Sequence, residues 1–105
     1  MADFSKILEQ ATQMQSRLEK VQDDLEKMTV TGSSGGGMVT VEADGKGQIT
    51  KVRVDPSIVN ASDVEMLEDL LLVALRDAQQ KSTDLAKQEM GKLTGGMSLP
   101  FKLPF

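Results

Sequence analysis

The sequence contains no cysteine, histidine, tryptophan or tyrosine. These absences exclude disulfides, thiolate or imidazole metal sites, and nucleophiles or triads built on cysteine or histidine. Aromatic residues are scarce as well, since the chain has three Phe and no other aromatic residue. Its seven Met have flexible side chains that can fill irregular gaps in a core. An enzyme would have to work with carboxylates, lysines and hydroxyls alone, and we expect a small aliphatic core.

The chain has 105 residues, which is the size of one small domain. No stretch approaches the ~20 apolar residues of a membrane span, and residues 1–10 lack the basic start and apolar run of a signal peptide. We therefore expect a cytoplasmic protein without membrane contacts. Its net charge is −4, which argues against a uniformly basic nucleic-acid surface.

Residues 3–28 have the clearest periodicity in the chain. Apolar side chains recur there at alternating steps of three and four, in the heptad pattern of a long helix with a narrow apolar seam. The seam consists of Phe4, Ile7, Ala11, Met14, Leu18, Val21, Leu25 and Met28. At 1.5 Å per residue this helix would be roughly 39 Å long, whereas a compact domain of this size has a radius of gyration of only ~13 Å. It must therefore project, or lie along a second long helix.

A second helix is predicted over residues 62–90. Ser62 and Glu65 have the spacing of a capping box at its start, and Gly91 follows its end. Residues 70–75 are apolar almost all around the helix, so we expect this middle part to be the most deeply buried segment of the chain.

Between the helices, residues 29–31, 38–43 and 48–54 are rich in Val and Thr and predict three short strands, with a hairpin turn at 44–47. The Gly-rich segment 32–37 predicts a mobile loop or a wide turn, and it lacks the Gly-Lys-Ser/Thr ending of a phosphate-binding P-loop. Residues 91–105 predict a flexible tail. The alternative is that its apolar residues dock onto the body or onto a partner. The fold class is thus α+β, in the order α-β-β-β-α, with a small three-stranded antiparallel sheet.

A sheet of three short strands covers about one helix, so two long helices leave a monomer with more apolar surface than it can bury. A homodimer would bury the remainder, and a helical hairpin within one chain is the competing explanation. The acidic residues near the start of the second helix match the helix dipole better than they match a paired-carboxylate or magnesium site. We accordingly predict no catalytic site, metal or cofactor.

Basic residues gather in three places. At 100° per residue, Lys6, Arg17, Lys20 and Lys27 share one stripe of the first helix, suited to following a phosphate backbone. The alternative is a solvated face, in which Lys20 pairs with Asp23 and Asp24. A second set, late in the second helix and at the start of the tail, consists of Lys81, Lys87 and Lys92. A third set, on the hairpin, consists of Lys46, Lys51 and Arg53. Aromatic residues are not interleaved with them, which argues against base stacking.

Several segments, taken in order, resemble the YbaB/EbfC family of bacterial nucleoid-associated proteins. They are residues 32–39 (GSSGGGMV), 45–47 (GKG), 52–56 (VRVDP), 64–70 (VEMLEDL) and 90–96 (MGKLTGG). The resemblance covers nearly the whole chain. It implies a tweezer-like homodimer with projecting helical arms, DNA binding at the nucleoid in the cytoplasm, a role in chromosome organisation or gene regulation, and no catalytic activity.

Two functional hypotheses follow. In the first, a homodimer binds double-stranded DNA through backbone phosphates, using Lys6, Arg17, Lys20, Lys27, Lys81, Lys87 and Lys92, with the hairpin group as a further candidate. In the second, the protein is an acidic dimeric adaptor that binds another protein through its apolar seam and tail, and its association with DNA is indirect.

Overall fold

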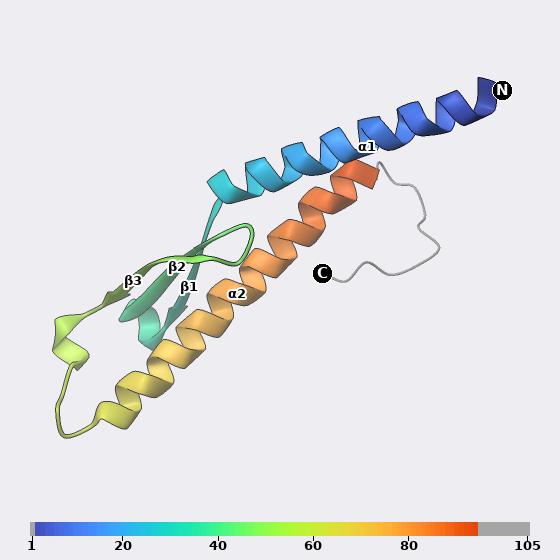
Figure 1. The fold of residues 1–105 in the computed structure, drawn as a ribbon. Coiled ribbons are helices and arrows are strands. Elements are labelled where there is room, and N and C mark those ends of the chain that lie inside the picture. The colour runs from blue at the N-terminus through green and yellow to red at the C-terminus, as the bar shows by residue number, and fades with distance from the viewer. Residues whose placement is uncertain (1, 95–105) are drawn as a thin grey trace.

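The structure is a computed structural model that describes residues 2–94 (Figure 1). The two long helices are α1 (Ala2–Lys27) and α2 (Val64–Thr94), and the three strands between them are β1 (Thr29–Ser34), β2 (Val39–Asp44) and β3 (Ile49–Val54). Short 3-10 turns occupy Gly35–Gly37 and Pro56–Ile58. This order confirms the predicted α+β class and the α-β-β-β-α sequence of elements.

The strands form one antiparallel sheet in the order β1-β2-β3, so β1 and β3 are its edges. On β2, side chains alternate between two environments, because Val39, Val41 and Ala43 are fully buried under α2 while Thr40 and Glu42 are half-buried on the opposite face. Helix α2 packs on β1 and β2. Strand β3 is exposed along its length except for the half-buried Val54. Helix α2 therefore covers one face of the sheet over β1 and β2 and leaves that face of β3 open.

The close contact between α2 and β1 explains why the Gly-rich segment differs from its prediction. The sequence predicts a mobile loop or a wide turn over residues 32–37. In the structure, Gly32 and the two serines after it belong instead to β1. A side chain at Gly32 would meet the backbone of α2, with its Cβ 2.8 Å from the Ala78 Cα and closer still to the Ala74 oxygen. Within this segment, the turn that follows β1 needs the left-handed freedom of glycine, as at Gly36, where φ is 67°.

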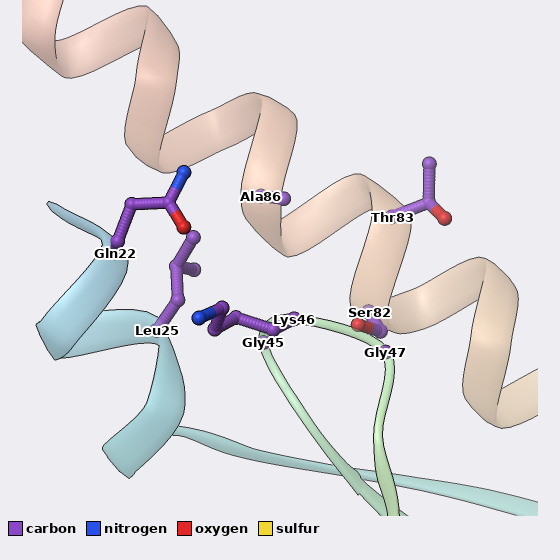
Figure 2. Close-up of a pocket in the computed structure, with 8 residues that line it drawn as sticks. All are labelled: Gln22, Leu25, Gly45, Lys46, Gly47, Ser82, Thr83 and Ala86. Carbon is purple, nitrogen blue, oxygen red and sulfur yellow. The ribbon is translucent and has the colours of Figure 1, made fainter. Parts of the chain in front are cut away.

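The hairpin turn at residues 44–47, which forms as predicted, is wedged between the two helices (Figure 2). The Gly45 amide donates to the carbonyl of Leu25 at the end of α1 (2.8 Å). From the other side, the buried Ser82 hydroxyl of α2 donates to the Asp44 carbonyl (2.8 Å). The turn therefore fixes where α1 leaves the sheet and how it meets α2.

Both ends of α2 differ from the prediction. Asp63, and not Ser62, caps the helix, because its carboxylate accepts a hydrogen bond from the Met66 amide (3.2 Å). At the other end, α2 continues through Gly91 to Thr94, four residues beyond the expected end at residue 90. One glycine lowers the stability of a helix by only about 1 kcal/mol. An ion pair of 3.1 Å between Glu89 and Lys92 supports the helix across Gly91. Residues 95–105, the rest of the predicted tail, lie outside the described residues.

The middle of α2 is buried on one side only, which corrects the expectation that residues 70–75 would be the most enclosed part of the chain. Ala74 is fully buried, but Leu72 and Val73 are 45% and 53% exposed. The reason is that a single sheet reaches only one face of the helix. Apolar side chains on the other face have no cover within the described part of this chain.

Helix α1 projects, as its length predicts. The described fold measures 73 × 24 × 17 Å and has a radius of gyration of 19.5 Å, against ~13 Å for a compact domain of this size. The carboxyl end of α1 is anchored by Leu25, which is 4% exposed, whereas Phe4 near its amino end is 64% exposed. Figure 1 shows α1 crossing the end of α2 and continuing beyond it as an arm.

Changing Gly32 to Ala should lower the free energy of unfolding by about 2 kcal/mol or more, because the new methyl group would overlap the backbone of α2. The matched control is Gly91→Ala, where a Cβ meets no described atom within 4 Å. That change should raise the stability by about 0.5–1 kcal/mol, since alanine is the better helix former. Denaturant unfolding of both variants measures this, and an unchanged Gly32→Ala protein would refute the close contact.

Candidate nucleic-acid interface

The four predicted basic residues of α1 lie exposed along the projecting arm. Lys6, Arg17, Lys20 and Lys27 are all accessible to solvent, and they fall within about 80° of one another around the helix axis. None of them pairs with a carboxylate among residues 4–93, whose side chains the structure describes. The alternative in which Asp23 and Asp24 neutralise Lys20 therefore lacks its ion pairs.

Two acidic residues share this sector of α1. Glu9 and Asp24 lie within the same angular range, so four cations and two carboxylates leave the stripe with two net positive charges. Exposed charges at such spacings are screened by salt over roughly 10 Å at 0.1 M. Any attraction of this face for an anionic polymer is thus short in range and sensitive to ionic strength.

The predicted set on α2 does not form a second continuous stripe. Lys81 and Lys92 lie on nearly the same side of the helix, while Lys87 is turned by about 120° or more from each of them. Lys92 pairs with Glu89. Lys87 is exposed and has no carboxylate partner among the described side chains, so it is the member of this set best placed to meet another molecule.

Lys81 joins a network that holds α2 against the edge strand β1. Its ammonium donates to the Thr31 carbonyl (2.9 Å) and lies 3.3 Å from the Asp77 carboxylate. Asp77 in turn accepts a hydrogen bond from the Ser33 amide (3.0 Å). The hydrogen bond from the Ser33 amide has the largest effect on Asp77 and lowers its pKa below the ordinary value. The hydrogen bond from Lys81 lowers this pKa further. These contacts occupy backbone groups that an exposed edge strand would otherwise offer to other chains.

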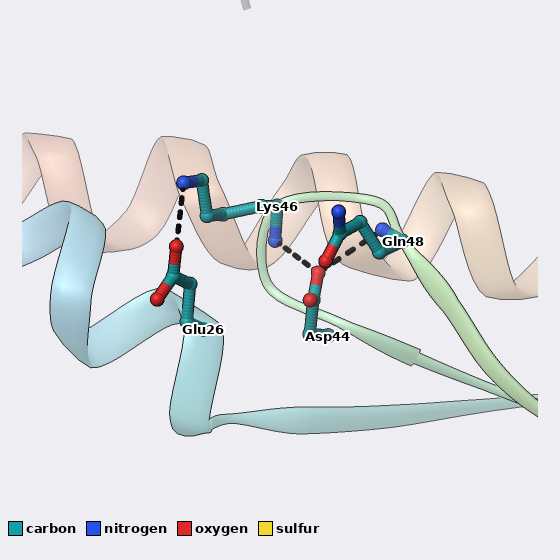
Figure 3. A network of polar contacts seen from close by, with 4 residues as sticks. All are labelled: Glu26, Asp44, Lys46 and Gln48. Atoms are coloured by element: carbon teal, nitrogen blue, oxygen red, sulfur yellow. Dashed lines mark hydrogen bonds and ion pairs between the residues drawn. The ribbon is translucent and has the colours of Figure 1, made fainter.

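The hairpin group divides between two places. Lys46 donates to Glu26 of α1 (2.8 Å, Figure 3), and this contact raises the pKa of the Lys46 ammonium. Lys51 and Arg53 lie on the outer face of the sheet, as their spacing predicts, around a hollow of about 150 Å³. Glu42 lines the same hollow, so this face has little net charge.

A larger cavity of about 370 Å³ lies between the hairpin turn, α1 and α2 (Figure 2). Its lining includes Leu25, Ala86 and the glycines of the turn, with Lys46 as the one charged side chain. Such a wall has no converging acids or bases that could do chemistry. In the described part of the chain, no three Asp or Glu side chains are close enough to hold a metal ion, and no helix is long and apolar enough to span a membrane.

Sequence reasoning overlooked Arg76. It is exposed on α2, on the face turned away from the sheet, and it pairs with no described carboxylate. Being the only basic residue within the acidic segment 62–77, it was masked by the net charge of its neighbours. Asp69, seven residues earlier, lies on the same face of the helix and is also exposed.

Comparison with known proteins gives consistent results over almost the full chain. The model of the YbaB/EbfC DNA-binding family matches residues 1–97. A nucleoid-associated protein from Gemmatimonas aurantiaca is 46% identical over 103 residues, which is 98% of this chain and 99% of that protein. Another, from Paramagnetospirillum magneticum, is 49% identical over 107 aligned residues and covers both chains completely.

The fold also has a counterpart among solved structures. The crystal structure of an uncharacterized protein from Helicobacter pylori matches with a TM-score of 0.79 and 25% sequence identity. The match covers 88% of this chain and 97% of the other. The arrangement of a three-stranded sheet with two long helices is therefore an architecture already observed by crystallography.

Replacing Asp77 by Asn should make the stability of the protein less dependent on pH. Because the pKa of Asp77 is lower in the folded state than its ordinary value of 3.8, the carboxylate stabilises the fold above that value, and this contribution is lost as the pH falls through the folded-state pKa. The stability difference between the wild type and Asp77→Asn should therefore be largest near neutral pH and shrink below about pH 4.

Denaturant unfolding from pH 7 to pH 3 measures this difference. Asp84→Asn is the matched control, because it removes one carboxylate from an exposed site of the same helix, where the partner is the Gln80 side chain. A difference between the wild type and Asp77→Asn that stays constant over this range would contradict the proposed role of the Ser33 and Lys81 contacts.

Proposed function

The chain belongs to the YbaB/EbfC DNA-binding family, and we propose that it is a nucleoid-associated protein that binds double-stranded DNA as a homodimer. The main contacts would be to backbone phosphates. Its role would be chromosome organisation or gene regulation in the bacterial nucleoid. The family is one of DNA-binding proteins and not of enzymes. The observation that carries the proposal is a stripe of cations that pair with no carboxylate among the described side chains, on an arm that projects from the body.

The uncovered apolar surface supports the homodimer. Ile49 and Val52 of β3 are 38% and 49% exposed, next to the part of the sheet that α2 covers. Neighbouring strands are about 4.8 Å apart and a helix is about 10 Å wide. One helix therefore covers β1 and β2, and the space over β3 suits a second helix. The α2 helix of a second copy, with its exposed Leu72 and Val73, would fill it.

Charge on α2 favours an antiparallel pair of these helices. If a two-fold axis passes between Leu72 and Val73, Arg76 of one copy lies opposite the partner's Asp69, and the same contact occurs twice. The two residues lie at equal distances along the helix from this axis, and both are exposed and unpaired among the described side chains. An apolar centre flanked by two opposite-charge contacts is typical of a specific dimer interface.

The dimer would present two α1 arms, each roughly 39 Å long, to one duplex. Each lysine or arginine that neutralises a phosphate releases counterions, so affinity must fall steeply with salt. The contacts come from side chains that reach phosphates, and aromatic residues able to stack on bases are absent from the stripe. Binding would therefore follow the shape and charge of the backbone more than the base sequence.

Changing Lys20 and Lys27 to Glu should weaken duplex binding at least tenfold at about 0.1 M salt. The slope of log K against log salt should become shallower by roughly two to four, because each lost phosphate contact removes ~0.9 and the dimer contains each site twice. Folding should be unaffected, since both residues are exposed. Fluorescence anisotropy with a labelled duplex at several salt concentrations measures both quantities.

The double variant Lys51→Glu/Arg53→Glu makes the same change of charge on the outer face of the sheet. It should weaken binding much less, and an equal effect would contradict an interface on the arms. If the wild type binds no duplex even at low salt, direct DNA binding is refuted and the adaptor hypothesis takes its place.

The single variants Asp69→Arg and Arg76→Asp should each weaken dimerisation at least tenfold, because each places two like charges opposite one another at the proposed two-fold axis. Combining them should restore the dimer, since the exchanged charges again attract. Analytical ultracentrifugation over a range of concentrations measures the dissociation constants. Weakening in both single variants without recovery in the combined variant would reject the antiparallel arrangement.

A further inference from the structure

The apolar seam of α1 is covered over only part of its length. Toward the sheet, Leu18 and Val21 are half-buried and Leu25 is buried, where the seam meets α2 and the hairpin turn. At the other end, Phe4 and Ile7 are 64% and 60% exposed. The proposed dimer uses α2 and β3, so it does not account for this bare part of the seam.

The carboxyl end of α2 lies beside the seam. Figure 1 shows α1 and α2 running in opposite directions, with the last turn of α2 next to the middle of α1. In that region of α2, Met90 is 8% exposed and Leu93 is half-buried. The chain therefore leaves Thr94 directed toward the amino end of α1, along the bare part of the seam.

The sequence after Thr94 has the length and pattern needed to cover this surface. Gly95 and Gly96 allow a change of direction, and then apolar residues occupy alternate positions: Met97, Leu99, Phe101, Leu103 and Phe105. Extended backbone repeats such side chains on one side about every 6.6 Å, compared with about 5 Å between successive residues of a heptad seam. Eleven residues reach at most about 36 Å, and the seam from Met14 to Phe4 needs only ~15 Å.

We propose that residues 97–105 dock, within the same chain, onto the bare seam of α1 formed by Phe4, Ile7 and Ala11. Attachment at Thr94, beside the seam, gives the segment an effective concentration in the millimolar range, which a separate partner would have to exceed. Pro100 and Pro104 favour the extended conformation and have no amide hydrogen to leave unpaired on an apolar surface. The docked segment stabilises the first turns of the arm. It leaves the basic stripe accessible, because the centre of that stripe lies about 150° around the helix from the bare seam.

Engineered cysteines test the docking directly, because the natural sequence has none. In the full chain, the pair Ile7→Cys/Phe101→Cys should form a disulfide within one chain at least ten times faster than the control pair Glu9→Cys/Phe101→Cys. Glu9 lies about 200° around the helix from Ile7, at a similar distance from Thr94. Non-reducing electrophoresis separates a link within one chain from a link between two copies.

Two outcomes of this experiment would overturn the proposal. Equal rates for the two pairs would show that the segment has no preference for the seam. A linked species of twice the chain mass, in which position 7 of one chain is joined to position 101 of the other, would show that the tail of a second copy occupies the seam. Neither readout involves DNA, so failure here is separate from failure of the proposed DNA binding.

Hydrogen exchange supplies an independent readout in the full chain. The double variant Phe101→Ser/Phe105→Ser should raise the exchange rates of amides in residues 7–11 at least fivefold, because the arm loses its cover. Amides of the buried region around Ala74 and Ala78 should keep their rates, which shows that the body is intact. Unchanged rates in residues 7–11 would also overturn the docking.

Discussion

The contact of α2 with β1 at Gly32 determines most of this architecture. Because Gly32 has no side chain and because Ala74 and Ala78 are small, the helix lies directly on the strand. The Ser34 hydroxyl donates to the Leu70 carbonyl (2.6 Å), and the Ser33 amide donates to Asp77, which fixes the same strand along two turns of α2. The helix is thereby held over β1 and β2, at one edge of a narrow sheet.

The open half of the fold is the consequence of this position. With α2 over β1 and β2, the inner face of β3 and the outer face of α2 keep apolar side chains in solvent, at a cost of roughly 25 cal/mol for each Å² left unburied. In the proposed dimer, a second copy would relieve that cost on both surfaces at once. The hairpin turn, held between α1 and α2, directs the arm away from the body. The surface proposed for dimerisation and the surface proposed for DNA are therefore separate.

Features that depend on neighbours in the sequence were predictable. The heptad of α1 gave its length and projection, and the helical angles placed its four cations on one exposed stripe. Contacts between residues far apart in the sequence were not predictable. The Gly-rich segment has the composition of a loop, and only the packing of α2 on it makes it part of a strand. The hydrogen bond of Lys81 goes to the carbonyl of Thr31, fifty residues earlier. Likewise, the exposure of Leu72 follows from how little of α2 one sheet can cover, which no local pattern reveals.

We propose that two chains together form the unit that binds DNA. Sedimentation equilibrium of the protein with a short duplex that has room for one binding unit tests it most directly, because the method reports the mass of the complex. We expect a complex of one duplex and two 11.4 kDa chains, formed at concentrations where the free protein is also dimeric. A saturated complex with a single chain on the duplex would contradict it.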